Sequence, residues 1–255
     1  MKLNYKKMGE GQPLLILHGV FGSLDNWMTL GKRFSEDFEV WLIDQRNHGH
    51  SPHSEEMSYP TMAKDLKNFI DQQQLENAIV LGHSMGGKVA MEFAIKYPDS
   101  LEKLIIADIS PESQSNHFDG IIEGLLAVEP STIEDRKEAE EKLAEYVPQK
   151  AVRQFLLKNL HRKENGNYEW RFNLKVIADK MDEISKWQVE DGEFKKPVLF
   201  LKGEKSDYIE KKDERRMKEL FPSFELKEIP SAGHWLHAEK PDDFYEEVSV
   251  FAAQQ

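Results

Sequence analysis

The sequence contains no cysteine among its 255 residues. This absence excludes disulfide bonds, a thiolate nucleophile and any metal site held by cysteine sulfur. It is compatible with a reducing compartment. Any covalent catalysis must therefore use another nucleophile, such as a serine hydroxyl.

Long apolar runs are also absent. The first thirteen residues, MKLNYKKMGEGQP, are polar and lead only to the short apolar run at residues 14–17. This start lacks the apolar region of a signal peptide. No stretch approaches the ~20 apolar residues that a membrane span requires. We therefore expect a soluble protein in the cytoplasm, with no membrane span.

Basic residues are scarce relative to acidic ones: 34 Lys and Arg stand against 46 Asp and Glu, a net charge of −12. Such a balance argues against a nucleic-acid partner or an anionic membrane surface. The length is sufficient for a substantial core. We expect a small-molecule substrate as the partner, and the sequence leaves the oligomeric state open.

The most informative stretch is AIVLGHSMGGKVAMEFA at residues 78–94. A short apolar run typical of a buried strand precedes the pattern G-x-S-x-G, and an amphipathic helical pattern follows it. This arrangement predicts a nucleophile elbow, a sharp strand-to-helix turn that exposes the hydroxyl of Ser84. Glycines beside the serine remove Cβ atoms that would collide in so tight a turn.

Strand and helix patterns alternate along most of the chain. Apolar runs at residues 14–17, 40–43, 78–81, 104–107 and 197–201 predict strands, and residues 59–72 and 214–221 predict helices. This alternation predicts an α/β fold with a mostly parallel central sheet and helices on both faces. A last strand at residues 224–229 and a helix at 242–252 complete the pattern.

Residues 111–186 interrupt this alternation. They are rich in charge, and their patterns predict helices without a strand. We expect an α/β core at residues 1–110 and 187–255, with a helical cap at residues 111–186 inserted over the carboxyl ends of the strands. Such a cap excludes water and shapes the substrate pocket.

A serine hydroxyl needs a base to take its proton at neutral pH. His234 follows the last predicted strand and comes after both the serine and the candidate acids. The order Ser…Asp…His is the one this sheet topology produces. We therefore predict that His234 is the general base for Ser84.

Four motifs together resemble the α/β-hydrolase superfamily: HGVFGS at residues 18–23, DQRNHG at 44–49, GHSMGG at 82–87 and AGHW at 232–235. Within it, the HG-x-FGS-x-DNW and D-x-RNHG-x-S patterns and WRFN at residues 170–173 resemble the branch of bacterial YbfF-type esterases and animal ABHD11-like hydrolases. The resemblance implies hydrolysis of carboxylic esters, or of acyl thioesters such as acyl-CoA, with no cofactor.

Two aspartates are candidates for the acid that orients His234. Many relatives in the superfamily place it after the strand that follows the cap, where Asp207 stands here. The YbfF-like branch implies Asp108 instead, at the end of the strand before the cap. A carboxylate at the mouth of an apolar strand is expected to be partly buried, and a buried carboxylate requires a partner. We favour Asp108 and keep Asp207 as the alternative.

The tetrahedral intermediate needs hydrogen-bond donors for its oxyanion. We expect one from the backbone N–H of Met85 and the other from that of Val20, with Phe21 as the alternative. His18 is expected to hold this loop by hydrogen bonds.

Three other polar features receive structural interpretations. We expect no metal at His48, His50 and His53, because no carboxylate or cysteine lies at a recognised ligand spacing. Asp44 and Arg46 are expected to pair and brace their loop. The side chain of His83 should point away from Ser84.

The sequence therefore predicts a serine esterase or thioesterase that works through an acyl-enzyme. One rival is a carbon–carbon bond lyase or hydrolase of the menaquinone-pathway type, for which Arg136, Arg153, Arg162 and Arg171 of the cap could bind a polyanionic substrate. The other is a slow-turnover ligand sensor on the same fold.

Overall fold

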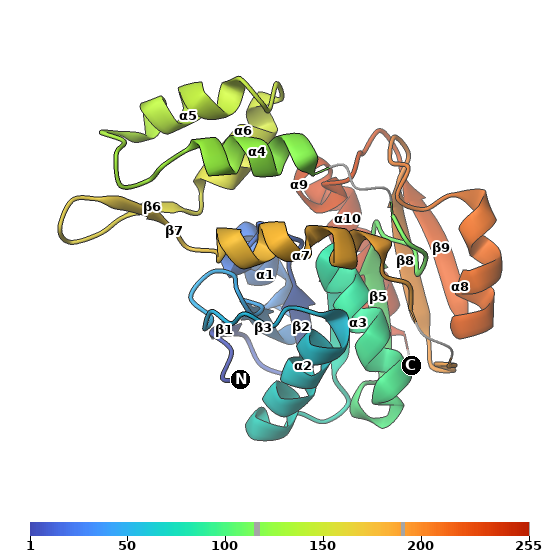
Figure 1. The fold of residues 1–255 in the computed structure, drawn as a ribbon. Coiled ribbons are helices and arrows are strands. Elements are labelled where there is room, and N and C mark those ends of the chain that lie inside the picture. Colours follow the sequence, from blue (N-terminus) through green and yellow to red (C-terminus); the bar gives the residue numbers. More distant parts are fainter. Residues whose placement is uncertain (115–117, 190–191, 255) are drawn as a thin grey trace.

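The computed structural model describes residues 1–114, 118–189 and 192–254. Its centre is a seven-stranded sheet in the order β1-β3-β2-β4-β5-β8-β9 (Figure 1). Only β1 is antiparallel to its neighbour. The strands are β1 (Tyr5–Met8), β2 (Gln12–Leu17), β3 (Phe38–Ile43), β4 (Ile79–His83), β5 (Lys103–Ala107), β8 (Val198–Gly203) and β9 (Phe224–Ile229).

The inner strands are apolar on both faces, as parallel strands covered by helices must be. Leu15, Val80 and Ile106 belong to a core shared with α2 (Tyr59–Gln73), α3 (Met85–Lys96) and α8 (Glu214–Leu220). Their neighbours Ile16, Leu81 and other alternate residues pack on the opposite face against α1 (Met28–Phe34) and α10 (Pro241–Ala253). The predicted α/β fold is confirmed.

Strand β1 was not predicted from the sequence. Three of its four residues are exposed, and it pairs along the outer edge of β3. An edge strand with a solvated face gives no apolar run, so pattern analysis does not detect it.

In its described residues, the segment between β5 and β8 contains four helices, which lie above the carboxyl ends of the strands (Figure 1). The prediction that it has no strand is wrong, because a two-stranded hairpin lies between α6 and α7. Each strand of the hairpin has three residues, too few for a recognisable alternation. The elements are α4 (Asp119–Ala127), α5 (Arg136–Ala144), α6 (Lys150–Leu157), β6 (Leu160–Arg162), β7 (Tyr168–Trp170) and α7 (Leu174–Lys186).

Short helical elements complete the chain: α9 (Leu236–Glu239) and the 3₁₀ helices Leu24–Trp27, Pro98–Ser100 and Lys211–Asp213. Within the described residues, every helix is too short or too polar to cross a lipid bilayer.

Candidate active site

Ser84 lies in the turn between β4 and α3 with φ 53° and ψ −119°, a conformation that L residues rarely adopt. The glycines around it leave no room for a side chain. A Cβ on Gly82 would lie 2.2 Å from the carbonyl oxygen of Gly86, and one on Gly86 would lie 2.5 Å from that of Leu17. The helix therefore starts directly against the strands, and the serine is held at the carboxyl edge of the sheet.

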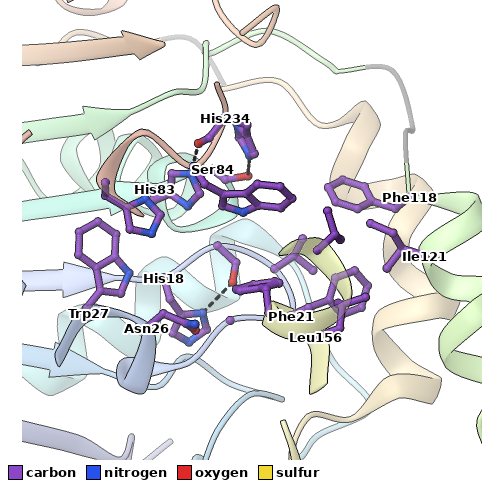
Figure 2. A pocket seen from close by; sticks show the side chains of 17 residues that line it. His18, Phe21, Asn26, Trp27, His83, Ser84, Phe118, Ile121, Leu156 and His234 are labelled. Carbon is purple, nitrogen blue, oxygen red and sulfur yellow. Dashed lines mark hydrogen bonds between the residues drawn. The ribbon is translucent and has the colours of Figure 1, made fainter. Parts of the chain in front are cut away.

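Three side chains that are distant in sequence form a hydrogen-bonded chain at this edge. The Ser84 hydroxyl lies 3.0 Å from Nε2 of His234 (Figure 2). Nδ1 of His234 lies 2.8 Å from a carboxylate oxygen of Asp108. A carboxylate only accepts, so Nδ1 carries the ring proton and Nε2 is free to accept from Ser84. Asp207, the alternative acid, is exposed and makes no such contact within the described part of the chain.

Asp108 is completely buried, and donors surround its carboxylate. One oxygen accepts the backbone N–H of Gly203 at 2.9 Å, and the other accepts the hydroxyl of Ser206 together with His234. Its backbone is left-handed, with φ 52°. These donors fix the carboxylate in one orientation, which in turn fixes the imidazole. Sequence analysis had not assigned Ser206 a role.

His234 is also held through its ring and its backbone. Its ring stacks on that of Tyr208 with 3.8 Å between centroids and 17° between planes. Burial, with smaller contributions from Asp207 and Asp108, raises the pKa of Tyr208 to about 12. The phenol therefore stays neutral beside the imidazole.

The imidazole of His83 packs beside that of His234, with 4.8 Å between the ring centroids. Its Nε2–H donates to the backbone carbonyl of His234 at 2.8 Å. Burial lowers the pKa of His83 well below its usual value, and the neighbouring imidazoles of His237 and His234 add to that effect. A neutral ring here avoids placing a second positive charge beside the base.

The backbone N–H and the backbone carbonyl of Phe21 both make hydrogen bonds to side chains. Its N–H donates to Nε2 of His48 at 3.2 Å, and its carbonyl accepts the side-chain amide of Asn159 at 2.7 Å. Burial lowers the pKa of His48 to about 3, with a further contribution from His18. The ring therefore remains neutral and able to accept. The Phe21 amide, our alternative oxyanion donor, is thus already engaged.

The N–H groups of Val20 and Met85 have no acceptor among the residues that the structure describes. Met85 is the first residue of α3, where backbone N–H groups lack partners within the helix. His18 holds the Val20 loop as expected: its Nδ1–H donates to the carbonyl of Gly19 at 2.8 Å, and its Nε2 accepts the N–H of Gln45 at 3.0 Å.

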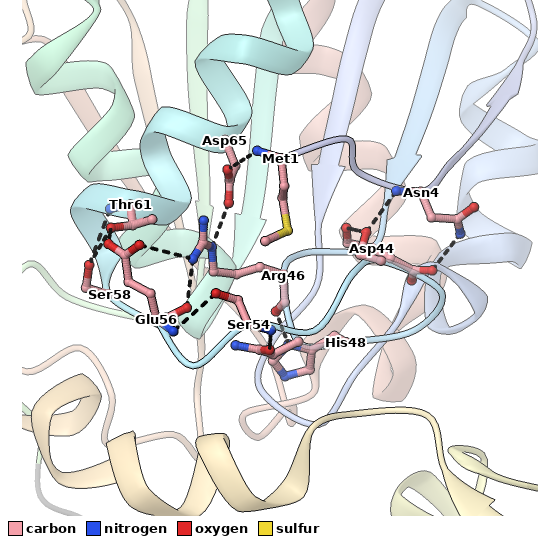
Figure 3. Close-up of polar contacts among 12 residues, drawn as sticks. Met1, Asn4, Asp44, Arg46, His48, Ser54, Glu56, Ser58, Thr61 and Asp65 are labelled. Carbon is pink, nitrogen blue, oxygen red and sulfur yellow. Dashed lines mark hydrogen bonds and ion pairs between the residues drawn. The ribbon is translucent and has the colours of Figure 1, made fainter.

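The predicted ion pair between Asp44 and Arg46 does not form. Arg46 donates to Asp65 in α2 at 2.7 Å, and the other oxygen of Asp65 contacts the N-terminal ammonium of Met1 at 2.7 Å (Figure 3). Asp44 instead accepts two backbone N–H groups of neighbouring loops and the side-chain amide of Asn4. The two charges therefore have separate partners: Asp44 is held by neutral donors, and Arg46 pairs with the helix.

His48, His50 and His53 lie in the loop between β3 and α2. In residues 1–114, 118–189 and 192–254, no three His, Cys, Asp or Glu side chains are placed to hold a metal ion. His48 is instead committed to its loop, since its Nδ1–H donates to the carbonyl of Arg46 at 2.9 Å.

Two cavities meet at Ser84, Val20 and Phe118. The larger one lies between the loop at residues 18–22 and the segment above the sheet (Figure 2). Its wall on that side is apolar and comes from α4 and α6, with Trp235 beside them: Phe118, Ile121, Val152, Phe155, Leu156 and Trp235.

The second cavity is lined by several polar side chains, including that of Lys88. Sequence analysis gave Lys88 no role, although a signal was present. It is a charged residue in a helix whose other residues up to Ala94 are nearly all small or apolar. All ten residues from Met85 to Ala94 are buried.

Comparisons with known proteins agree with this architecture. A family model described as alpha/beta hydrolase fold matches residues 12–241. The sn-1-specific diacylglycerol lipase ABHD11 of Danio rerio is 40% identical over 251 residues, which cover 95% of this chain and 79% of that protein. Esterase YbfF of Escherichia coli is 36% identical over 248 residues, which cover 95% of each chain.

Among solved structures, one described as a marine microorganism esterase superposes with a TM-score of 0.96 at 45% sequence identity. The match covers 98% of this chain and 99% of that one. Both the sequence motifs and the sheet topology lead to the same assignment. This chain therefore belongs to the α/β-hydrolase fold family, in the branch that contains the ABHD11 and YbfF proteins.

Proposed function

We propose that this protein is a serine esterase or thioesterase, with Ser84, His234 and Asp108 as its catalytic triad. The observation that carries the proposal is the continuous hydrogen-bonded chain Ser84–His234–Asp108, at 3.0 and 2.8 Å, at the junction of two cavities. The esterase and lipase names of its relatives support the same class of reaction.

The mechanism follows from the proton positions. His234 takes the proton of the Ser84 hydroxyl as the oxygen attacks the acyl carbon, and Asp108 stabilises the imidazolium that forms. The backbone N–H groups of Val20 and Met85 donate to the oxyanion. His234 then returns the proton to the leaving oxygen or sulfur. A water molecule, activated by the same imidazole, releases the acid from the Ser84 ester.

The cap, residues 111–186, supplies the apolar wall of the larger cavity. We infer that this wall holds the hydrocarbon part of the substrate, because the side chains from α4 and α6 are apolar and face the nucleophile. The cap also fixes the oxyanion loop directly, through the bond from Asn159 to the carbonyl of Phe21. Substrate binding and oxyanion stabilisation thus depend on the same segment.

The rival carbon–carbon bond chemistry required arginines facing the pocket. The side chains of Arg136 and Arg153 donate to backbone carbonyls of the cap itself, and Arg171 pairs with Asp25. Arg162 donates to the carbonyl of Gly166. None of these four arginines lines either of the two cavities at Ser84. A polyanionic substrate would therefore lack the expected partners.

The test is turnover of p-nitrophenyl esters and acyl-CoAs of graded chain length by the wild type and by Ser84→Ala. We expect steady multiple turnover, and a decrease in kcat/KM of more than about 10⁴ in the variant. Ser249→Ala in α10, on the other face of the sheet, is the matched control and should keep wild-type rates. Activity retained in Ser84→Ala would refute the assignment, and a single slow turnover would favour the sensor.

A further inference from the structure

The second cavity contains a buried cation that the proposed reaction does not use. Lys88 lies four residues after Ser84 on α3, is 2% exposed and lines this cavity. Its ammonium donates to the carbonyl of Glu112 and, at 3.0 Å, to that of Trp187. These two residues lie where the chain enters and leaves the cap. A lysine ammonium has three donors, so one remains.

No carboxylate of the described residues lies within 4 Å of the Lys88 ammonium. Asp213 and Glu112 are the acidic groups that act on it at longer range, and burial still lowers the pKa of Lys88 to about 7. Removing one partner of a buried ion pair is strongly unfavourable, because it leaves an uncompensated charge. The Trp187 ring lies 5.4 Å from the Lys88 ammonium, measured to its centroid. An anion entering the cavity would add a charged partner and favour the ammonium over the neutral amine.

Two further polar side chains line this cavity. The hydroxyl of Ser185 is buried and makes no hydrogen bond to any described residue. The side chain of Tyr59 lines the same cavity. Burial raises the pKa of Tyr59 well above its usual range, so the phenol remains a donor. A buried hydrogen-bond donor that lacks an acceptor raises the free energy of the folded protein. A ligand that accepts hydrogen bonds would remove this cost.

We propose that the second cavity binds a carboxylate of the substrate, with Lys88 as its counter-ion and Ser185 and Tyr59 as further donors. The inference rests on the proposed esterase function and narrows its substrate class to esters or thioesters that carry a second, ionised carboxyl group. One buried cation matches one carboxylate. The larger apolar cavity holds the remaining part of the substrate.

Two pairs of esters test this proposal and locate the carboxylate. Mono-4-nitrophenyl glutarate is compared with 4-nitrophenyl pentanoate, so that the charge is on the acyl side. 4-Acetoxybenzoate is compared with phenyl acetate, so that it is on the leaving-group side. Wild type should show at least a tenfold higher kcat/KM for the charged member of one pair, mainly through a lower KM.

Lys88→Met should reduce that ratio at least tenfold, and the neutral ester measured in the same variant reports its folding and basal catalysis. Lys103→Met is the matched control. Lys103 is also buried and donates to backbone carbonyls near the C-terminus, but it lines neither cavity at Ser84. Its variant should keep the wild-type ratio.

If wild type prefers the charged ester by less than tenfold in both pairs, the proposed carboxylate site is refuted. This measurement uses the wild-type protein alone, so it does not depend on the folding of a variant. A preference that persists in Lys88→Met, or is lost equally in Lys103→Met, would also overturn it. If wild type hydrolyses the neutral esters without preference, only this inference fails. If it hydrolyses none of the four, the proposed function itself fails.

Discussion

Replacing Asp108 by asparagine should disable the base without removing the nucleophile. In the native site, the carboxylate accepts from Gly203, Ser206 and Nδ1 of His234. An asparagine whose oxygen keeps the bond from Gly203 would turn its NH₂ group toward the imidazole. His234 would then carry its proton on Nε2 and could no longer accept from Ser84.

Loss of the acid from a Ser–His–Asp triad lowers kcat by about 10⁴. We expect a decrease of about 10³–10⁴ in kcat/KM for Asp108→Asn, which corresponds to about 4–5.5 kcal/mol of transition-state stabilisation. The hydroxyl of Ser206 contacts the same oxygen as His234 and can turn to accept from the amide, which stabilises this inactive orientation.

The assay is hydrolysis of p-nitrophenyl butyrate, with thermal unfolding as a check on the fold. Asp207→Asn is the matched control: it changes the same functional group on an exposed residue one position beyond Ser206. Its rate should stay within about threefold of wild type, as expected for a surface change. A folded Asp108→Asn protein with more than a tenth of the wild-type activity, or a slower Asp207→Asn, would refute the reasoning.

Two further predictions concern the elbow and the buried imidazoles. Gly86→Ala places a Cβ 2.5 Å from the carbonyl oxygen of Leu17. We therefore expect the free energy of unfolding to fall by about 1–3 kcal/mol and the esterase rate to decrease. Gly120→Ala, whose Cβ would make only an ordinary contact at 3.4 Å, should change neither quantity. Denaturant titration and ester turnover measure both, and equal effects would contradict the packing argument. Burial lowers the pKa of His18 to about 4 and those of His48 and His237 to about 3, and it also lowers that of His83. Unfolding lets these rings take up protons below their unfolded pKa of about 6.5, so stability present above that pH should fall as the pH drops toward 4, by up to about 1.4 kcal/mol per pH unit for each ring. The urea concentration at the unfolding midpoint should decline in this way between pH 7.5 and 5. His237→Phe should reduce the slope of that decline by roughly a quarter. An unchanged slope would argue against a neutral, buried His237.

The neutral imidazoles also explain how the oxyanion loop keeps its shape. His48 accepts from Phe21, and His18 accepts from Gln45, so each ring acts as a fixed acceptor. Protonation would convert either acceptor into a donor facing an N–H group. The loop that carries Val20 is therefore expected to lose its geometry in acid before the sheet unfolds.

Several elements could be predicted from the sequence because their signals are local. The buried strand, the glycines and the amphipathic helix around Ser84 are contiguous, and each reflects a steric or packing requirement of that one turn. The inner strands were also predicted, since burial on both faces requires an uninterrupted apolar run. The position of His234 after the last strand followed from the order of these elements.

Tertiary structure alone decided which side chains meet. Asp108 and Asp207 both follow strands at the same edge of the sheet, and only the fold turns the first toward His234 while leaving the second exposed. Arg46 pairs with Asp65 on a helix, not with its near neighbour Asp44. The sequence of α3 likewise does not reveal that no described carboxylate lies within 4 Å of the Lys88 ammonium. Which side chains become partners depends on the distances between segments that are far apart in the chain. Local sequence patterns do not determine those distances.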